Sequence, residues 1–479
     1  MSASEYDVIV IGAGPVGENV ADGAVKGGLS VAIIESELVG GECSYWACMP
    51  TKALLRDVSA LRAVQHLPAA AAAVTGVLDP ALVLARRDRF ASNWDDAGQV
   101  SWLESVGIDL VRGHGRITGT RTVSVTTPDG DLKTLTARHA VVVATGSSAA
   151  VPPIRGLTGA RPWTSREAVA ADVVPPRLAI IGGGVVGTEM ATAYSALGSR
   201  VTLIARDGVL PNVEPYASEQ VVSSLEASGV RVMFGASPAQ VHRDQAGTVH
   251  VTLGDGETID ADEVLVATGR EPNTGDLGLD TIGLPPGSWL DVDETLRVVD
   301  DHGQVLQDGW LYAAGDVNRR VLLTHQGKYQ ARAVGDVIAA RANGGVVDDA
   351  PWGRHVATAD HRAVPQVVFS SPEVVSVGYT VASAAAAGRA VRAVEYDLGA
   401  VAGAVLHADG YAGRASVLID DETRTIVGFT AVGPDTTELV HAATIAIAGE
   451  VPLDRLWHAV PAYPTISEVW LRLLETAGR

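Results

Sequence analysis

Two short apolar runs with similar surroundings stand far apart in the chain. Residues 6–11 are rich in valine and isoleucine, and residues 178–181 form a second run of the same kind. Each run leads into a glycine-rich turn and then into apolar residues at helical spacing. Short, continuously apolar runs are typical of buried parallel strands. The pattern therefore predicts two strand–turn–helix units, each followed by another strand, at residues 30–34 and 200–204.

The first glycine-rich turn has Gly12, Gly14 and Gly17 in a Gly-x-Gly-x-x-Gly pattern, and the next strand ends at Glu35. Glycines at these positions allow a pyrophosphate to approach the start of the helix, and the acidic residue binds a ribose hydroxyl. A glycine-rich turn beside a surface glutamate is the plain alternative. The position of the motif between a strand and a helix favours a dinucleotide site.

The second turn has Gly182, Gly184 and Gly187, but the strand after it ends in Ala205 and Arg206 rather than in an acid. An arginine at this point can pair with the 2′-phosphate of NADPH, which an acid would repel. The sequence thus favours NADPH, with NADH as a second option. The alternative is a solvated arginine beside Asp207. Two dinucleotide sites in one chain indicate electron transfer between two cofactors.

Cys43 and Cys48 are the only cysteines, and a helical pattern at residues 52–61 follows them. A structural disulfide across so short a loop would add only about 2 kcal/mol of stability. Two buried thiols are another alternative. A redox-active pair is favoured, because the start of a helix stabilises a thiolate.

Composition and charge exclude several classes of protein. The chain has 36 basic and 56 acidic residues, a net charge of −20, which argues against nucleic-acid or membrane partners. Two cysteines rule out a disulfide-rich scaffold and a cysteine zinc cage, and we predict no metal site. The start resembles no signal peptide and no apolar run is long enough to span a membrane, so we expect a cytoplasmic protein.

On these motifs the chain resembles the flavoprotein disulfide reductases, the class I pyridine nucleotide-disulfide oxidoreductases that include dihydrolipoamide dehydrogenase, glutathione reductase and mercuric reductase. The resemblance extends over essentially the whole chain, and the motifs follow the family order. Besides the two glycine turns and the cysteine block, it rests on residues 144–146, 267–273, 312–316 and 464–468.

The resemblance implies an α/β fold with two Rossmann-like dinucleotide-binding domains, for FAD and NAD(P), and an α+β C-terminal dimerisation domain. The FAD-binding domain would occupy residues 1–150 and 274–345, the NAD(P)H-binding domain 151–273, and the dimerisation domain 351–479. It further implies a homodimer whose active site is shared between the subunits.

The resemblance also assigns cofactor contacts. FAD would bind the first unit, with Asp316 holding the ribityl chain, and the nicotinamide cofactor would bind the second unit. The remaining cofactor residues that it implies are Gly41, Thr145, Gly146, Glu189, Gly269, Arg270, Gly315 and His325.

The catalytic residues are likewise expectations from the resemblance. Cys48 would lie next to the flavin, and Cys43 would be the interchange thiol that attacks the substrate. Lys52 and Glu189 would pair near the flavin N5, where a cation stabilises reduced flavin. The plain alternative for that pair is an ordinary ion pair on a helix surface.

The tail departs from the family pattern. Where the family has an acid/base histidine supplied by the partner subunit, this chain has Tyr463, whereas the glutamate is kept as Glu468. Phenols titrate near 10 and imidazoles near 6.5, so a tyrosine is a poor proton acceptor at neutral pH. Tyr463 either donates a hydrogen bond or a proton, or only fills the space of the histidine.

Together these observations predict an FAD-dependent, NADPH-preferring enzyme that uses a Cys43–Cys48 redox disulfide to reduce a disulfide or another sulfur-containing small molecule. One alternative is an NAD(P)H:quinone reductase, or diaphorase, that passes electrons directly from FAD. Another is a slow dihydrolipoamide dehydrogenase, and a third is a non-catalytic redox sensor. A strict mercuric reductase is disfavoured, because the chain has no third cysteine to receive the metal.

Two further expectations concern the segment after the first unit. Residues 52–106 are predicted to be an inserted helical stretch, in which Arg86, Arg87 and Arg89 form a solvated helix face. Between the cysteines, Tyr45 and Trp46 either border the approach to Cys43 or pack in the core.

Overall fold

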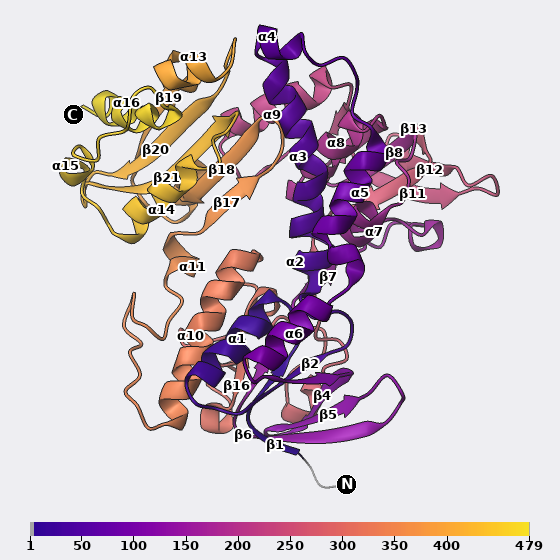
Figure 1. Cartoon of the computed structure of the whole chain (residues 1–479), viewed down its shortest axis with the longest axis vertical. Helices are drawn as coiled ribbons and strands as arrows, with labels where there is room; N and C mark the ends of the chain where they lie inside the picture. The colour runs from indigo at the N-terminus through magenta and orange to yellow at the C-terminus, as the bar shows by residue number, and fades with distance from the viewer. Residues whose placement is uncertain (1–3, 479) are drawn as a thin grey trace. The chain divides into compact units, whose positions relative to one another are not determined.

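The computed structural model describes residues 4–478 and divides into two compact units (Figure 1). Unit 1 contains residues 4–49, 88–149 and 269–361, and unit 2 contains residues 50–87, 150–268 and 362–478. Both units are thus assembled from segments that lie far apart in the sequence.

Unit 1 is built on a seven-stranded sheet with the order β3-β2-β1-β6-β5-β4, in which β16 also pairs with β6. Strands β3, β2, β1, β6 and β16 run parallel, whereas β4, β5 and the first part of β6 form an antiparallel meander. The strands are β1 (Ser4–Ile11), β2 (Val31–Glu35), β3 (Asp109–Arg112), β4 (His114–Gly119), β5 (Thr122–Thr126), β6 (Leu132–Val143) and β16 (Leu311–Ala313).

Helices and a small two-stranded sheet complete unit 1. The helices are α1 (Pro15–Lys26), α2 (Gly41–Tyr45), α6 (Ala97–Ser105) and α10 (Thr324–Ala342), with short 3₁₀ turns η1 (Ser92–Trp94), η3 (Leu279–Ile282), η4 (Gln307–Gly309) and η5 (Asp316–Asn318). The small sheet pairs β7 (Ser147–Ala149) with β15 (Arg270–Pro272). Helix α11 (Ala359–Arg362) follows at the end of the unit.

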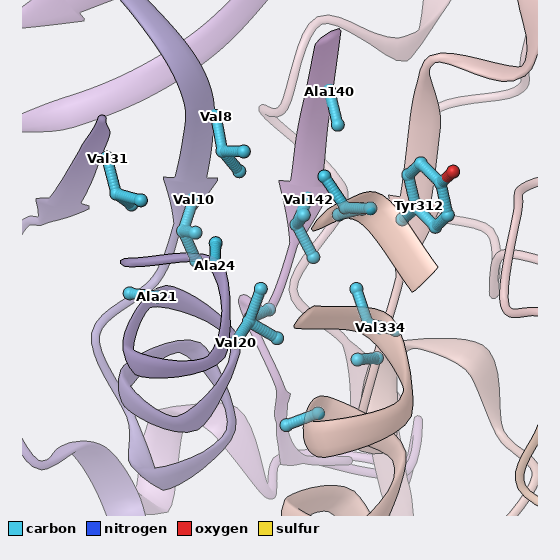
Figure 2. Packing of buried hydrophobic residues seen from close by; sticks show 14 of the residues in the cluster. Val8, Val10, Val20, Ala21, Ala24, Val31, Ala140, Val142, Tyr312 and Val334 are labelled. Carbon is cyan, nitrogen blue, oxygen red and sulfur yellow. The ribbon is translucent and has the colours of Figure 1, made fainter. Parts of the chain in front are cut away.

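The core of unit 1 has one apolar layer on each face of the sheet, because successive side chains of a strand point to opposite faces. Val8 and Val10 of β1 face α1 and α10, as Figure 2 shows for Val20 and Val334 of these helices. Ile9 packs in the cluster on the other face.

Helices α1 and α10 lie side by side in unit 1 because two glycines let their backbones approach (Figure 1). A Cβ at Gly335 of α10 would lie 2.9 Å from the Cα of Gly23 in α1, closer than real Cβ contacts allow. This close approach lies in the second half of α1 and packs it directly against α10.

The first part of unit 2 repeats the strand–turn–helix architecture. A parallel sheet has the order β10-β9-β8-β14, and a separate antiparallel sheet has the order β11-β12-β13. The strands are β8 (Arg177–Ile181), β9 (Arg200–Ala205), β10 (Arg231–Phe234), β11 (Pro238–Arg243), β12 (Val249–Leu253), β13 (Thr258–Ala261) and β14 (Glu263–Val266). The helices are η2 (Thr158–Ala160), α7 (Ser165–Ala170), α8 (Val185–Ala196) and α9 (Pro215–Ala227).

The C-terminal part of unit 2 is an antiparallel sheet with the order β17-β18-β21-β20-β19, accompanied by helices. Its strands are β17 (Pro365–Val368), β18 (Glu373–Gly378), β19 (Arg392–Asp397), β20 (Arg414–Asp420) and β21 (Thr425–Gly433). The helices are α12 (Val381–Ala386), η6 (Leu398–Ala400), α13 (Ala402–His407), α14 (Leu439–Ala448), α15 (Leu453–Leu456), η7 (Ile466–Glu468) and α16 (Val469–Thr476).

The predicted fold class is therefore confirmed: two Rossmann-like parallel sheets are followed by an α+β C-terminal part. Both predicted strand–turn–helix units form where the glycine patterns indicated them, as β1 to α1 and as β8 to α8. The domain boundaries proposed from the sequence stay predictions.

The inserted helical stretch contains α3 (Cys48–Gln65), α4 (Pro68–Ala71) and α5 (Pro80–Phe90), and here one expectation was wrong. Arg87 does not belong to a solvated face, because it is only 1 % exposed. Its guanidinium donates hydrogen bonds to the carbonyl oxygens of Val169 and Ala171 at the end of α7. A rigid fork of donors suits this task, and helical periodicity alone could not reveal it.

Candidate functional site

The first glycine turn of unit 1 has almost no room for side chains. Gly12 has a φ of +101°, and a Cβ there would lie 2.5 Å from the carbonyl oxygen of Ala144. A Cβ at Gly17 would lie 1.9 Å from the carbonyl oxygen of Gly12. At Gly14 the nearest atom to such a Cβ is 3.9 Å away, so the backbone is open on that side. These features fit a ligand that lies directly against the backbone.

Glu35, the last residue of β2, forms hydrogen bonds with the backbone of the first glycine turn. Its Oε2 accepts a hydrogen bond from the Ala13 amide, and its Oε1 accepts one from the Glu37 amide, both at 2.8 Å. Burial raises the pKa of this carboxyl, while the backbone hydrogen bonds act in the opposite direction. Glu35 thus holds the turn in place and lies where a dinucleotide fold presents its ribose-binding acid.

Asp316 is the first residue of η5 in unit 1. Its Oδ2 accepts a hydrogen bond of 2.6 Å from the Ser147 hydroxyl, which in turn accepts one of 2.6 Å from Nε of Arg270. The Arg270 Nε lies 3.8 Å from the same Asp316 oxygen. Gly315, with a φ of +79°, directly precedes the aspartate. The structure therefore brings together three predicted cofactor residues and adds Ser147, which the sequence analysis missed.

The segment before β7 contains the predicted residues Thr145 and Gly146. Gly146 adopts a φ of +70°. The buried Oγ1 of Thr145 has no hydrogen-bond partner among residues 4–478. An unpartnered buried hydroxyl costs free energy unless a ligand satisfies it. Together with the close glycine turn and Asp316, it fits an extended polar cofactor such as FAD.

The two cysteines lie in two consecutive helices. Cys43 lies within α2, and Cys48 is the first residue of α3. Both are half-buried, and the Sγ of Cys48 lies 3.3 Å from the Oγ1 of Thr324, the first residue of α10. A helix start and a neighbouring hydroxyl both favour a thiolate. The contact with Thr324 could not be predicted, because 276 residues separate the two in sequence.

The sequence also singled out Gly41 and His325 as cofactor residues, and Tyr45 and Trp46 as residues between the cysteines. Gly41 opens α2, and a Cβ there would lie 2.9 Å from the Cα of Gly14 in the first glycine turn. His325 is exposed in the first turn of α10. Tyr45 is 1 % exposed and its hydroxyl donates to the carbonyl oxygen of Val39, so it packs in the core. Trp46 is half-buried beside it, with 5.6 Å between the ring centroids.

The second glycine turn, in unit 2, reproduces the steric features of the first. A Cβ at Gly182 would lie 2.3 Å from the carbonyl oxygen of Ala267, and a Cβ at Gly187 would lie 1.9 Å from that of Gly182. Around Gly184 the space is open. The same backbone contacts at both turns support two dinucleotide sites rather than one.

Two further predicted residues follow strands of unit 2 along the chain. Arg206 follows β9 and is exposed, and its guanidinium pairs with Asp207 at 2.7 Å. Gly269 ends the segment after β14 with a φ of +149°. The arginine is accessible to a ligand, but Asp207 competes for it.

Lys52 and Glu189 form an ion pair within unit 2, between α3 and α8. The Lys52 Nζ donates to the Oε2 of Glu189 at 2.8 Å, and the Glu189 side chain is nearly inaccessible. The Oε1 of Glu189 accepts a hydrogen bond of 3.0 Å from the Phe369 amide. The carboxylate of this ion pair is therefore buried, which argues against an ordinary ion pair on a helix surface.

The tail residues Tyr463 and Glu468 differ strongly in exposure. Tyr463 is 75 % exposed, whereas Glu468 is 5 % exposed. The Oε1 of Glu468 accepts a hydrogen bond of 2.6 Å from Arg472, and its Oε2 has no partner within the described chain. The Tyr463 ring is therefore accessible to a ligand or to another chain.

Within residues 4–478, no group of three or more histidine, cysteine, aspartate or glutamate side chains is placed to hold a metal ion. Over the same residues, no helix combines the length and apolar character that a membrane span requires.

Comparisons with known proteins identify the family of the chain. The family model described as "Pyridine nucleotide-disulphide oxidoreductase" matches residues 6–331, and the model of the dimerisation domain of that family matches residues 364–473. Dihydrolipoyl dehydrogenase of Chlamydia pneumoniae is 30% identical over 472 residues, which covers 97% of this chain and 95% of that protein. Mercuric reductase of Shigella flexneri is 31% identical over 475 residues, covering 98% and 80% respectively.

Solved structures show the same fold over nearly the whole chain. LpdA from Mycobacterium tuberculosis has a TM-score of 0.81 with 26% identity and covers 99% of both chains. The HOCl-induced flavoprotein disulfide reductase RclA from Escherichia coli has a TM-score of 0.82 with 23% identity and the same coverage. The chain therefore belongs to the pyridine nucleotide-disulphide oxidoreductases, FAD-dependent oxidoreductases that use pyridine nucleotides.

Proposed function

We propose that this protein is an FAD-containing, NADPH-preferring enzyme that reduces a disulfide or another sulfur-containing small molecule through Cys43 and Cys48. The observation that carries the proposal is the placement of the cysteines. Cys48 opens helix α3 and contacts the hydroxyl of Thr324, and Cys43 lies in the helix just before it. Membership of the family supports a redox role for such a pair.

The cofactor residues of unit 1 fit FAD, which supplies a two-electron relay between nicotinamide and disulfide when bound. The first glycine turn and Glu35 would hold the adenosine and pyrophosphate part. Asp316, supported by Ser147 and Arg270, would hold the ribityl chain. The unpartnered Thr145 hydroxyl gives the site a further polar contact.

The second glycine turn would bind the nicotinamide cofactor in unit 2. Its open position at Gly184 supports this role, and the exposed Arg206 supports a preference for the 2′-phosphate of NADPH. The resemblance further assigns Lys52 and Glu189 to the flavin N5, and their buried ion pair is consistent with a fixed ammonium group.

The chemistry of the cysteines follows thiol–disulfide exchange. The Cys43 thiolate attacks one sulfur of the substrate disulfide, forming a mixed disulfide, and the other substrate sulfur leaves and takes up a proton. Cys48 then attacks Cys43, which forms the Cys43–Cys48 disulfide and releases the second substrate thiol. The substrate gains two electrons and two protons, and the cysteine pair loses two electrons.

The tail would act in a homodimer, in which Tyr463 and Glu468 complete the site of the partner subunit. The dimerisation-domain match and the exposed Tyr463 support this arrangement. A phenol donates a proton or a hydrogen bond but is a poor base at neutral pH. We therefore expect a substrate whose reduction does not require a histidine as the base. The enzyme would work in the cytoplasm, where thiols are kept reduced, without nucleic-acid or membrane partners.

The second candidate is quinone reduction directly from FAD, and Tyr463 in place of the family histidine favours it. Cys43→Ser separates the two functions. Disulfide reduction should be abolished while quinone reduction continues, with Ser44→Ala as a control on the same helix. Disulfide turnover by the Cys43 variant would contradict the proposal.

A slow dihydrolipoamide dehydrogenase is tested by Tyr463→His. A large gain in lipoamide reduction would show that the tyrosine limits that chemistry. An unchanged low rate would show that another part of the chain excludes lipoamide.

A further inference from the structure

Gln330, on helix α10 of unit 1, is fully buried and connects three polar groups. Its Oε1 accepts hydrogen bonds from the Gly315 amide and from Nδ2 of Asn318, both at 2.8 Å. Its Nε2 donates to the Oδ2 of Asp360, also at 2.8 Å. The carboxamide therefore has a donor end toward Asp360 and an acceptor end toward Gly315.

Asp360, in the short helix α11, determines the orientation of the Gln330 side-chain amide. It is 8 % exposed, and its Oδ1 accepts a second hydrogen bond of 2.9 Å from Nε2 of Gln326. An ionised carboxylate only accepts hydrogen bonds, so it requires the donor end of each amide. With Gln330 held in this way, only its oxygen can face the Gly315 amide.

The Gly315 peptide touches the first glycine turn. Gly315 has a φ of +79°, and a Cβ there would lie 2.9 Å from Cγ2 of Val16. Val16 lies between Gly14 and Gly17 and also meets Gly327 of α10, where a Cβ would lie 2.6 Å away from its Cγ2. A small shift of the Gly315 peptide would therefore move both the glycine turn and the neighbouring Asp316.

We propose that Asp360 is a positioning residue for the dinucleotide site of unit 1: it orients Gln330, and Gln330 holds the turn at Gly315 and Asp316 in register with Val16. Asp360 acts through Gln330 and contacts no cofactor itself. The inference rests on the proposed assignment of this site to FAD.

Two glutamines on the same helix provide a matched test. Gln326 and Gln330 are both buried, and both donate to Asp360, but only Gln330 contacts Gly315. Gln330→Met should raise the dissociation constant for FAD about tenfold, the ratio expected when a buried amide loses its acceptor. Gln326→Met should raise that constant clearly less than Gln330→Met does, because it removes one donor to Asp360 but keeps the contact of Gln330 with Gly315.

Asp360 itself is tested by a non-polar and a conservative variant. Asp360→Leu removes the acceptor for Gln330 and should weaken FAD binding as Gln330→Met does. Asp360→Asn keeps a carbonyl oxygen for Gln330, while Gln326 can rotate to accept from the new amide, so most of the affinity should return. These two variants keep the inference testable if Gln330→Met does not fold.

The measurements are FAD titration of the deflavinated full-length protein by fluorescence quenching, the visible circular dichroism of the bound flavin, and the melting temperature of the apoprotein. If the role of this network were purely structural, both glutamine variants would lower the melting temperature and would bind FAD with the same affinity. Equal dissociation constants for the two variants would therefore overturn the inference. Wild-type affinity in Asp360→Leu would overturn it as well. If the wild-type chain binds no FAD, the proposed function fails together with it.

Discussion

The Lys52 ammonium donates a hydrogen bond of 2.8 Å to a carboxylate oxygen of Glu189, which lies 137 residues further along the chain. The second carboxylate oxygen accepts from the Phe369 amide, and the ammonium lies 4.9 Å from the centroid of the Phe369 ring. Glu189 is 2 % exposed, so these contacts are what compensate its charge. Burying a carboxylate is tolerable only with such partners.

Lys52→Met should destabilise the protein, because it leaves the Glu189 carboxylate buried without a counter-charge. We expect the free energy of unfolding to fall by about 3 kcal/mol. Adding Glu189→Gln to that variant should recover a part of the loss, since the unpaired charge is then removed. Urea denaturation of the two single variants and the double variant checks this, and strictly additive losses would contradict the coupling.

Comparing alanine substitutions at Gly12 and Gly28 distinguishes the cost of a positive φ from the cost of a steric clash. Gly12 and Gly28 have φ values of +101° and +84°, but a Cβ at Gly12 would lie 2.5 Å from a carbonyl oxygen, whereas nothing lies within 4 Å at Gly28. Gly28→Ala should cost only about 1 kcal/mol of strain and keep its flavin. Gly12→Ala should lose the flavin, because the turn must shift.

The ratio of flavin to protein absorbance in the purified variants measures this difference. Equal flavin content in both variants would mean that the close contact between Gly12 and Ala144 does not shape the cofactor site.

Glu18, in the first turn of α1, predicts an unusual pH dependence. Burial raises the pKa of its carboxyl from 4.5 to about 7; Glu35 adds to the rise and Lys328 opposes it. Its Oε1 has no hydrogen-bond partner in the described chain. Between these two values the folded protein keeps a proton that the unfolded chain releases, so stability falls as pH rises toward 7 and stays reduced above it.

Glu18→Gln should therefore raise the free energy of unfolding by about 2 kcal/mol at pH 8 and have little effect below pH 4.5. Melting temperatures at the two pH values check this, with the exposed Glu104→Gln on α6 as the control. A stabilisation of equal size at both pH values would show that the charge of Glu18 is not its cause.

The cofactor preference is tested at Arg206, which is exposed and paired with Asp207 at 2.7 Å. Arg206→Ala should raise the KM for NADPH about tenfold, by loss of a charge-assisted contact, and leave the KM for NADH unchanged. Asp207→Asn releases the arginine from its competitor and should lower the KM for NADPH. Steady-state kinetics with both nucleotides measures these effects, and equal changes for both would refute the role of Arg206.

The sequence was sufficient for the parts of the site that local patterns encode. Both glycine turns lie between a strand and a helix, and Glu35 ends β2, as the residue types and spacing indicated. The helix predicted after the cysteines forms too, but it begins earlier, at Cys48, and Cys43 lies in the separate helix α2. These features depend on neighbours within about 30 residues, and local backbone chemistry determines them.

The residues that the sequence did not reveal depend on distant partners. Ser147 supports Asp316 across 169 residues, and Thr324 meets Cys48 across 276. The residues next to Arg87 in the sequence are those expected around an exposed arginine. In the structure, however, its guanidinium donates hydrogen bonds to carbonyl groups about 80 residues away. Such contacts form only when the fold brings the segments together, and no periodicity indicates them.

The central claim is that the cysteine pair exchanges electrons with the bound flavin. Anaerobic titration of the purified yellow protein with NADPH, followed by visible absorption, tests it most directly. We expect a long-wavelength band, typical of a thiolate beside flavin, after addition of about two electrons per subunit, and its absence in Cys48→Ser. Bleaching of the flavin without that band would contradict the account and favour direct reduction of quinones.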